Sequence, residues 1–129
     1  MQVGKEIEVR NVQIDSQGNY IRTYEILTDK EKPTIVMLHG YGASSVIFWK
    51  ILKPLSQDYN LVLVDILGMG GSSRPQFTIK TREEADIYMI EWFEAWRLSY
   101  VKGGGLTDFI LAGHSFGGYI AGLYAVKYH

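Results

Sequence analysis

The chain has no cysteine, which excludes disulfides, thiolate metal sites and cysteine nucleophiles. No stretch approaches the roughly 20 apolar residues of a membrane span, and the N-terminus lacks the apolar core of a secretory signal. An excess of one charge is missing too, since 13 Lys and Arg stand against 14 Asp and Glu. The net charge of -1 gives no electrostatic reason to expect nucleic acid as a partner. We therefore expect a cytoplasmic protein that binds neutral or amphiphilic ligands.

The sequence does contain enough apolar material for a packed core. Of its 129 residues, 47% are hydrophobic and 21% are charged, which is the balance of a folded protein rather than a disordered one. The length suits one modest domain, and the chain has no internal repeat or low-complexity segment. The sequence thus predicts a single domain over residues 1–129.

Five segments have the patterns of β-strands. Residues 7–14 and 20–27 alternate apolar and polar side chains around a turn, which predicts a β-hairpin. Residues 34–38, 60–65 and 109–112 are continuous β-favouring runs, which is typical of strands buried on both faces. We interpret these three segments as interior strands of a parallel sheet.

Three further segments have helical periodicity. The first presents one apolar stripe and is expected to end or bend at Pro54. The second begins at Thr81, which forms a capping box with Glu84, and stops at the glycines 103–105. The third begins directly after Ser115 and carries small residues that favour close packing against the sheet. The expected stripes are Phe48, Ile51, Leu52 and Leu55, then Ala85, Tyr88, Met89, Trp92 and Trp96, then Tyr119, Ile120, Leu123 and Val126.

The order of these elements is hairpin, strand, helix, strand, helix, strand, helix, and it favours the α/β class with right-handed crossovers. We expect three α/β/α layers around a mostly parallel sheet with an N-terminal antiparallel hairpin. The second helix carries the aromatic residues Trp92, Phe93 and Trp96, which would suit membrane contact. Core packing against the sheet explains them more simply.

The segment Gly113-His114-Ser115-Phe116-Gly117 is the main candidate for chemistry. It follows an apolar strand and opens a helix, which is the setting of a nucleophile elbow. A sharp turn lifts the serine hydroxyl clear of the backbone and brings strand and helix so close that the positions two before and two after must be small. Gly113 and Gly117 meet this requirement. The alternative is a glycine-rich turn with a bystander serine.

A second loop, His39-Gly40-Tyr41-Gly42, directly follows the first parallel strand. At this position the architecture places a donor of an oxyanion hole, and the glycines let the loop run close to a substrate. The backbone N–H groups of Tyr41 and Phe116 would hold the oxyanion, the latter at a helix N-terminus whose dipole favours negative charge. The alternative is a plain strand-to-helix turn.

The loop 65–73 is rich in glycine and follows a strand, as a phosphate-binding loop does. It lacks the lysine and the glycine spacing of such a loop. We interpret Asp65 as a hydrogen-bond acceptor that fixes the loop, rather than as a catalytic acid.

Together these motifs resemble the α/β-hydrolase superfamily with a serine nucleophile. The resemblance rests on His39-Gly40, on Asp65 with Gly68, Gly70 and Ser72, and on Gly113 to Gly117, in this order across nearly the whole chain. Residues 67–75 and 94–97 are similar to one branch, the lysophospholipase and lysophosphatidic-acid-acyltransferase-like proteins that include the lipid-droplet lipase coactivator. Some members of that branch carry asparagine at the nucleophile position, whereas this chain has Ser115. The resemblance implies an α/β-hydrolase fold and acyl chemistry at Ser115 without a metal or cofactor.

In this family an acid and a histidine base follow the serine along the chain. Here no Asp or Glu follows Ser115. His39 belongs to the oxyanion loop, His114 shares the serine's turn, and His129 ends the last helix about 20 Å away. The acyltransferase pattern His-x-x-x-x-Asp is absent as well. We expect a truncated gene product or gene model that covers the N-terminal part of the fold, hydrolyses esters poorly alone, and exposes a sheet edge prone to aggregation.

The leading interpretation is a carboxylic-ester hydrolase that acts on lipid or lysophospholipid esters through an acyl-enzyme at Ser115. One alternative is a lysophosphatidic acid acyltransferase, in which the acyl group passes to a lysophospholipid instead of water. Another is a non-catalytic regulator of lipid metabolism. The expected partner is a small-molecule or lipid ester substrate, with peripheral contact to membranes or lipid droplets. Dehalogenases and epoxide hydrolases of this fold use an aspartate nucleophile, so Ser115 argues against them.

Overall fold

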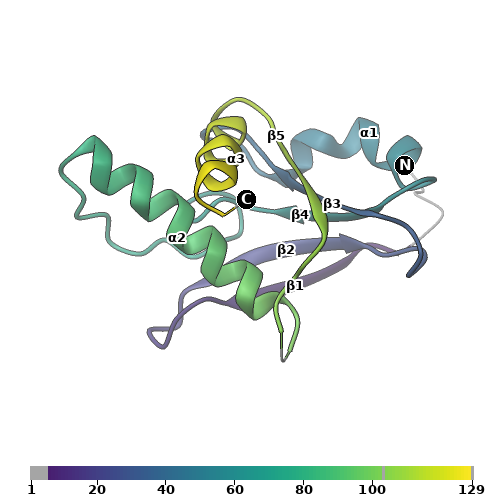
Figure 1. Ribbon diagram of the computed structural model, residues 1–129, viewed down its shortest axis with the longest axis horizontal. Coiled ribbons are helices and arrows are strands. Elements are labelled where there is room, and N and C mark those ends of the chain that lie inside the picture. The colour runs from purple at the N-terminus through teal and green to yellow at the C-terminus, as the bar shows by residue number, and fades with distance from the viewer. Residues whose placement is uncertain (1–5, 103, 129) are drawn as a thin grey trace.

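The centre of the protein is a five-stranded mixed sheet (Figure 1). A computed structural model describes residues 6–102 and 104–128. Its strands are β1 Glu8–Gln13, β2 Tyr20–Ile26, β3 Thr34–Leu38, β4 Asn60–Val64 and β5 Phe109–Gly113. Their spatial order is β1-β2-β4-β3-β5. The pairs β1–β2 and β2–β4 are antiparallel, whereas β3 is parallel to both β4 and β5. The predicted hairpin and the mostly parallel arrangement of the later strands are confirmed.

Three helices cover the two faces of this sheet. They are α1 Trp49–Leu55, which follows the 3-10 turn η1 Ser45–Phe48, then α2 Arg82–Tyr100 and α3 Phe116–Lys127. Side chains of β3 and β4 alternate between the faces, so that Ile35 packs with Leu52 of α1 while Val36 packs beneath α2 and α3. The predicted three layers are therefore present. Pro54 lies in the last turn of α1, as the sequence predicts.

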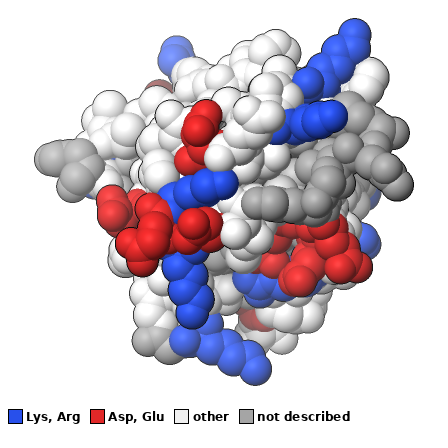
Figure 2. All heavy atoms as spheres, turned by 90° about the vertical axis from the view of Figure 1, so that its right-hand side faces the viewer, with Lys and Arg blue, Asp and Glu red and all other residues white. Residues whose placement is uncertain are grey.

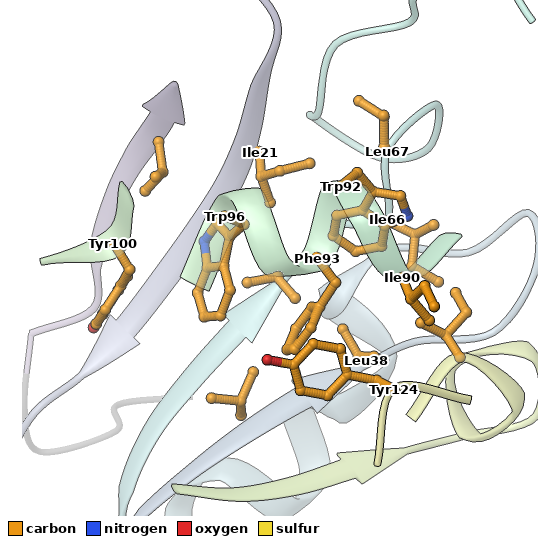
Figure 3. Close-up of a cluster of buried hydrophobic side chains, with 14 of the residues drawn as sticks. Ile21, Leu38, Ile66, Leu67, Ile90, Trp92, Phe93, Trp96, Tyr100 and Tyr124 are labelled. Carbon is orange, nitrogen blue, oxygen red and sulfur yellow. The ribbon is translucent and has the colours of Figure 1, made fainter. Parts of the chain in front are cut away.

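The main hydrophobic core lies between α2, α3 and the sheet (Figure 3). The ring of Phe93 is fully buried and packs edge-on against Tyr124 of α3, with centroids 4.7 Å apart. Trp96 is buried beside it and donates its indole N–H to Thr23 Oγ1 of β2 at 3.0 Å. The aromatic residues of α2 are thus core residues, which confirms the simpler of the two interpretations.

The stripe expected on α2 is only partly right. Its carboxyl-terminal half is buried as expected, but Ile90 and Phe93 belong to the buried face and were not included. Ala85, Tyr88 and Met89 are only partly buried, because the first turns of α2 extend past the sheet (Figure 1).

The ends of α2 also differ in part from expectation. At its start, Glu84 N–H donates to Thr81 Oγ1 as in a capping box, but the Glu84 carboxylate accepts from Lys80 N–H instead of returning to Thr81. At its end, the helix stops at Tyr100, before the glycines 103–105, because Val101 is already extended. Gly104 and Gly105 close a turn back onto Val101, while Gly103 lies outside the described residues.

The predicted stripe of α3 is wrong at both ends. The buried positions are Gly117, Ile120 and Tyr124, whereas Tyr119 is 41% and Val126 is 80% exposed. The reason is the close backbone contact at Gly117, described below, which fixes the rotation of the helix about its axis.

β5 is an edge strand in the described part of the chain, which confirms the expected exposed sheet edge but not the interior position that the apolar run favours. Only β3 pairs with it there, and Ile110 is 49% exposed. No helix among the described residues is both long and apolar enough to cross a membrane. On the face drawn in Figure 2, acidic and basic side chains are interspersed with uncharged ones.

Candidate active site at the carboxyl edge of the sheet

Ser115 occupies the turn between β5 and α3 in a strained conformation. Its φ of 54° and ψ of -115° are rare for a residue with a side chain. Its hydroxyl makes no helix-capping hydrogen bond, and the residue is exposed. The turn thus presents a free hydroxyl at the edge of the sheet, as the sequence predicts for a nucleophile elbow.

Close packing of α3 against β5 and against the end of β3 maintains this turn. A Cβ added at Gly113 would lie 2.3 Å from the carbonyl carbon and oxygen of Gly117, and one added at Gly117 would lie 2.3 Å from the carbonyl oxygen of Leu38. Both contacts are with backbone atoms, which cannot rotate away. The glycines two before and two after the serine are therefore required. Gly113 meets the predicted requirement that strand and helix lie close together, whereas Gly117 is required because α3 also lies against the end of β3. Of the other small residues of α3, Gly122 has no atom within 4 Å of its added Cβ and makes no such contact.

The loop after β3 lies against the Ser115 turn. A Cβ added at Gly40 would lie 3.4 Å from Ser115 Cβ and 3.3 Å from His114 Nδ1. His114 N–H also donates to the Leu38 carbonyl at 2.9 Å, which ties the turn to the end of β3. The two predicted loops thus come together at one edge of the sheet.

The two N–H groups expected to form an oxyanion hole lie on these neighbouring loops. The rings of Tyr41 and Phe116 meet edge-on, with centroids 6.1 Å apart. Within the described residues, neither backbone N–H donates to a protein acceptor. Both donors remain available to a ligand next to Ser115, with Phe116 at the N-terminus of α3.

His39 is a buried structural residue. Its Nε2 accepts a hydrogen bond from Ile66 N–H at 2.9 Å, so Nε2 carries no proton and Nδ1 donates to the Gly40 carbonyl at 2.7 Å. The neutral imidazole therefore makes no ion pair with Asp65, although Nε2 and Oδ1 lie 3.9 Å apart. His39 links the loops after β3 and β4 and is fully buried.

Asp65 fixes the loop that follows β4. Its Oδ1 accepts from Ser45 N–H at 2.7 Å, and its Oδ2 accepts from Gly71 N–H at 2.8 Å and from the Tyr24 hydroxyl at 3.3 Å. The carboxylate also raises the pKa of Tyr24, in addition to the larger effect of burial. Gly70 has a φ of +54°, and a Cβ there would lie 2.3 Å from Asp65 Oδ2. This geometry matches the predicted loop-fixing role.

No base for Ser115 is found in the described part of the chain. His114 lies on the exposed surface of the turn, and the His39 ring is hydrogen-bonded to Gly40 and Ile66 instead of to Ser115. His129 lies outside the described residues. The described residues also contain no cluster of His, Asp and Glu able to hold a metal ion.

A cavity of about 540 Å³ opens beside the two loops, and the sequence analysis did not identify it. Tyr41 and Phe116 form part of its wall, and the loop after β4 and the start of α2 form the rest. Arg74 lines it as well, at the end of the string that carries the family resemblance. A larger hollow of about 820 Å³ lies at the other end of β5, where Asp108 and Phe109 line it away from Ser115.

The sequence analysis also missed a polar cluster that joins α2 to α3. Arg97 binds both carboxylate oxygens of Glu94, at 2.8 and 2.6 Å, and its remaining terminal nitrogen donates to the Leu106 carbonyl. This contact lowers the pKa of Glu94. The Tyr124 hydroxyl donates to the same carboxylate, and burial raises the pKa of Tyr124. The i, i+3 spacing of Glu94 and Arg97 is the sequence signal for the first pair.

Comparison with known proteins agrees with this geometry. The chain is 43% identical over 113 residues to a 1-acylglycerol-3-phosphate O-acyltransferase of Arabidopsis thaliana, and 35% identical over 114 residues to the 1-acylglycerol-3-phosphate O-acyltransferase ABHD5 of Rattus norvegicus. Each match covers 88% of this chain but only 26% and 31% of the relative, respectively. The chain thus spans between a quarter and a third of the length of these relatives.

Solved structures show the same architecture. A bacterial membrane phospholipase A superposes with a TM-score of 0.78 at 29% identity, over 95% of this chain and 36% of that protein. The carboxylesterase CesB of Bacillus subtilis superposes with a TM-score of 0.75 at 24% identity, over 95% of this chain and 39% of the other, which shows the shared fold alone. Residues 33–129 match the family defined by the α/β-hydrolase fold. The chain belongs to the α/β-hydrolase family.

Proposed function

We propose that Ser115 is the nucleophile of an acyl-ester chemistry whose substrates are lipid or lysophospholipid esters. The observation that carries this proposal is the strained, exposed Ser115 held by Gly113 and Gly117 directly beside the Gly40 loop. Strain of this kind persists only where the surroundings enforce it, and it clusters at functional sites. Lipid esters also imply peripheral contact with membranes or lipid droplets on the cytoplasmic side.

The proposed chemistry begins with attack of Ser115 Oγ on the ester carbonyl carbon. The hydroxyl proton passes to a histidine base, and the N–H groups of Tyr41 and Phe116 hold the carbonyl oxygen as it becomes an oxyanion. The bond to the alcohol then breaks, and the alcohol leaves with the proton from the base. In the second half, water gives a proton to the base and attacks the acyl carbon. The bond to Ser115 Oγ breaks, the base returns that proton to Oγ, and the fatty acid is released. The base and its carboxylate partner must come from outside the described residues.

Acyl transfer to a lysophospholipid is the second candidate. It differs only in the second half, where a lysophospholipid hydroxyl replaces water as the acceptor. The observation in its favour is the 43% identity to the Arabidopsis 1-acylglycerol-3-phosphate O-acyltransferase, whose name specifies an acylglycerol phosphate as the acyl acceptor.

A chimera tests the proposal. This chain's matched segment replaces the corresponding 113 residues of the Arabidopsis relative, which supplies the remainder of that protein. We expect a fluorophosphonate probe to modify Ser115, as located by peptide mass spectrometry. Ser115→Ala should lower p-nitrophenyl ester turnover about 1,000-fold or more, whereas Ser99→Ala, at an exposed position of α2, should leave turnover and labelling unchanged.

Adding lysophosphatidic acid to the same assay separates the two acceptors. Hydrolysis releases the same free acid with or without it, whereas acyl transfer diverts the acyl group into phosphatidic acid. A chimera that melts cooperatively but resists the probe would reject Ser115 as the nucleophile and favour a non-catalytic regulator of lipid metabolism.

A further inference from the structure

The cavity beside Ser115 combines an apolar wall with a single charge. Leu67, Met69 and Met89 line it, and the rings of Phe77 and Tyr88 meet edge-on in its wall, with centroids 5.7 Å apart. Its volume of about 540 Å³ lies in the usual range for small-ligand sites. Of the described residues that line it, Arg74 alone is charged. The lining residues are Tyr41, Gly42, Leu67, Gly68, Met69, Arg74, Pro75, Phe77, Tyr88, Met89 and Phe116.

Arg74 is held in place without being neutralised. One terminal nitrogen donates to the Ser72 carbonyl at 3.2 Å and the other to the Gly70 carbonyl at 3.0 Å. These carbonyls belong to the turn that the Asp65 carboxylate and carbonyl fix through Gly71 N–H and the Ser72 hydroxyl. The loop thus orients the guanidinium, and within the described residues its remaining N–H donors have no acceptor.

Three of the other four arginines in the described chain differ from Arg74 in this respect, whereas Arg22 likewise makes no ion pair there but does not line the cavity. Arg10 pairs with Glu25, Arg82 with Asp86 and Arg97 with Glu94. Within the described residues, Arg74 makes no ion pair with a carboxylate. A fixed and unpaired guanidinium at the edge of an apolar cavity is suited to bind an anionic group of an amphiphilic ligand.

We propose that Arg74 binds the phosphate of a lysophospholipid whose acyl chain occupies the apolar part of this cavity. The inference rests on the proposed acyl chemistry at Ser115, because Tyr41 and Phe116 both line the cavity and carry the N–H groups for the ester carbonyl. When the Tyr41 and Phe116 N–H groups bind the ester carbonyl, the acyl end of the lipid is a neutral ester and cannot be the anion that Arg74 binds. The anion therefore belongs to the headgroup, and a phosphate fits the planar guanidinium fork. Arg74 then discriminates phosphate-bearing lipids from neutral acylglycerols.

Binding to the Ser115→Ala chain tests this without turnover. Isothermal titration calorimetry compares octanoyl lysophosphatidic acid, octanoyl monoacylglycerol and glycerol phosphate, in this chain and in the Ser115→Ala chimera. We expect the lysophosphatidic acid to bind most tightly. Adding Arg74→Gln should weaken its binding roughly 10-fold or more while leaving monoacylglycerol binding unchanged. The Arg74→Lys variant should bind lysophosphatidic acid with an affinity between those of the parent and of Arg74→Gln, because lysine keeps the charge but loses the planar guanidinium fork.

Arg82→Gln is the matched control, since it removes the same charge from an exposed side chain of α2 that does not line the cavity. Unchanged lysophosphatidic acid affinity in a folded Arg74→Gln variant would overturn the inference. So would glycerol phosphate binding as tightly as the lipid, because the apolar wall would then contribute nothing. If the fluorophosphonate probe labels Ser115 but lysophosphatidic acid binding does not depend on Arg74, only this inference is rejected. If binding depends on Arg74 but the probe does not label Ser115, only the proposed chemistry is rejected.

Discussion

The loop after β4 and the turn around Ser115 both follow a parallel strand and lie at the same edge of the sheet. They differ in the hydrogen bonding and burial of their polar side chains. In the loop, Asp65 is fully buried, and both carboxylate oxygens accept hydrogen bonds. Ser72 there is also buried, donating to the Asp65 carbonyl and accepting from Arg22 N–H. In the turn, Ser115 is exposed and makes no capping bond. Hydrogen bonds to buried side chains therefore hold the loop after β4, whereas close backbone packing at the glycines holds the Ser115 turn.

This difference suits a supporting role for the loop after β4 and a reactive role for the Ser115 turn. A loop whose polar groups are satisfied keeps one conformation and can orient neighbours such as Arg74. A turn held by sterics can keep its hydroxyl unbonded, as a nucleophile requires. Substitutions that add atoms should therefore damage the turn, and substitutions that remove hydrogen bonds should damage the loop.

The largest effect is expected from Gly117→Ala, which adds a Cβ where α3 lies in close contact with the backbone of residues 38 and 39. Its Cβ would lie 2.3 Å from the Leu38 carbonyl oxygen and 2.5 Å from that of His39. Because neither backbone atom can rotate away, we expect the free energy of unfolding to fall by about 3 kcal/mol in urea titrations. Gly122→Ala is the control in the same helix, where nothing lies within 4 Å, and it should raise stability by about 0.5 to 1 kcal/mol. Equal effects at both positions would refute the steric account.

A smaller loss is expected from Asp65→Asn, which keeps the size of the side chain. The amide presents an N–H₂ group to one of the backbone N–H donors, Ser45 or Gly71, and leaves that buried donor without an acceptor. We expect a loss of about 2 kcal/mol in urea unfolding. Asp58→Asn, on the exposed surface after α1, should change stability by less than about 0.5 kcal/mol. A neutral Asp65→Asn would show that the loop does not depend on this carboxylate.

The sequence predicts these two segments well because both depend on local steric or hydrogen-bonding requirements. Gly113 contacts Gly117 only four residues later, and Asp65 binds Gly71 only six residues later. The strands were equally accessible, since periodicity is local. Features that depend on helix orientation were not, as the exposed Val126 shows. Its helix is rotated by the contact at Gly117, which no periodicity reveals.

The cavity was beyond sequence reasoning for a similar reason. Tyr41, Arg74 and Phe116 are far apart along the chain and meet only when three strand ends share one edge. Arg74 had a signal in the string 67–75, but nothing in that string indicates that its guanidinium lines a cavity. For β5 the sequence carries two different indications: its apolar run favours an interior strand, whereas the expected exposed sheet edge is the one that β5 forms in the described part of the chain.

The smallest effect, and the one that separates stability from chemistry, is expected from Ser115→Gly. Glycine adopts a φ of 54° and ψ of -115° without the steric penalty of a Cβ. The free energy of unfolding, measured in urea, should therefore rise by about 1 kcal/mol. The same change should abolish fluorophosphonate labelling of the chimera. Asp108→Gly is the control, because Asp108 also has a positive φ, of 55°, before β5. It should gain less, since aspartate tolerates left-handed conformations better, and labelling should persist. A Ser115→Gly variant less stable than the parent would mean that the serine stabilises its own turn, and the contrast between a bonded loop and a strained turn would fail.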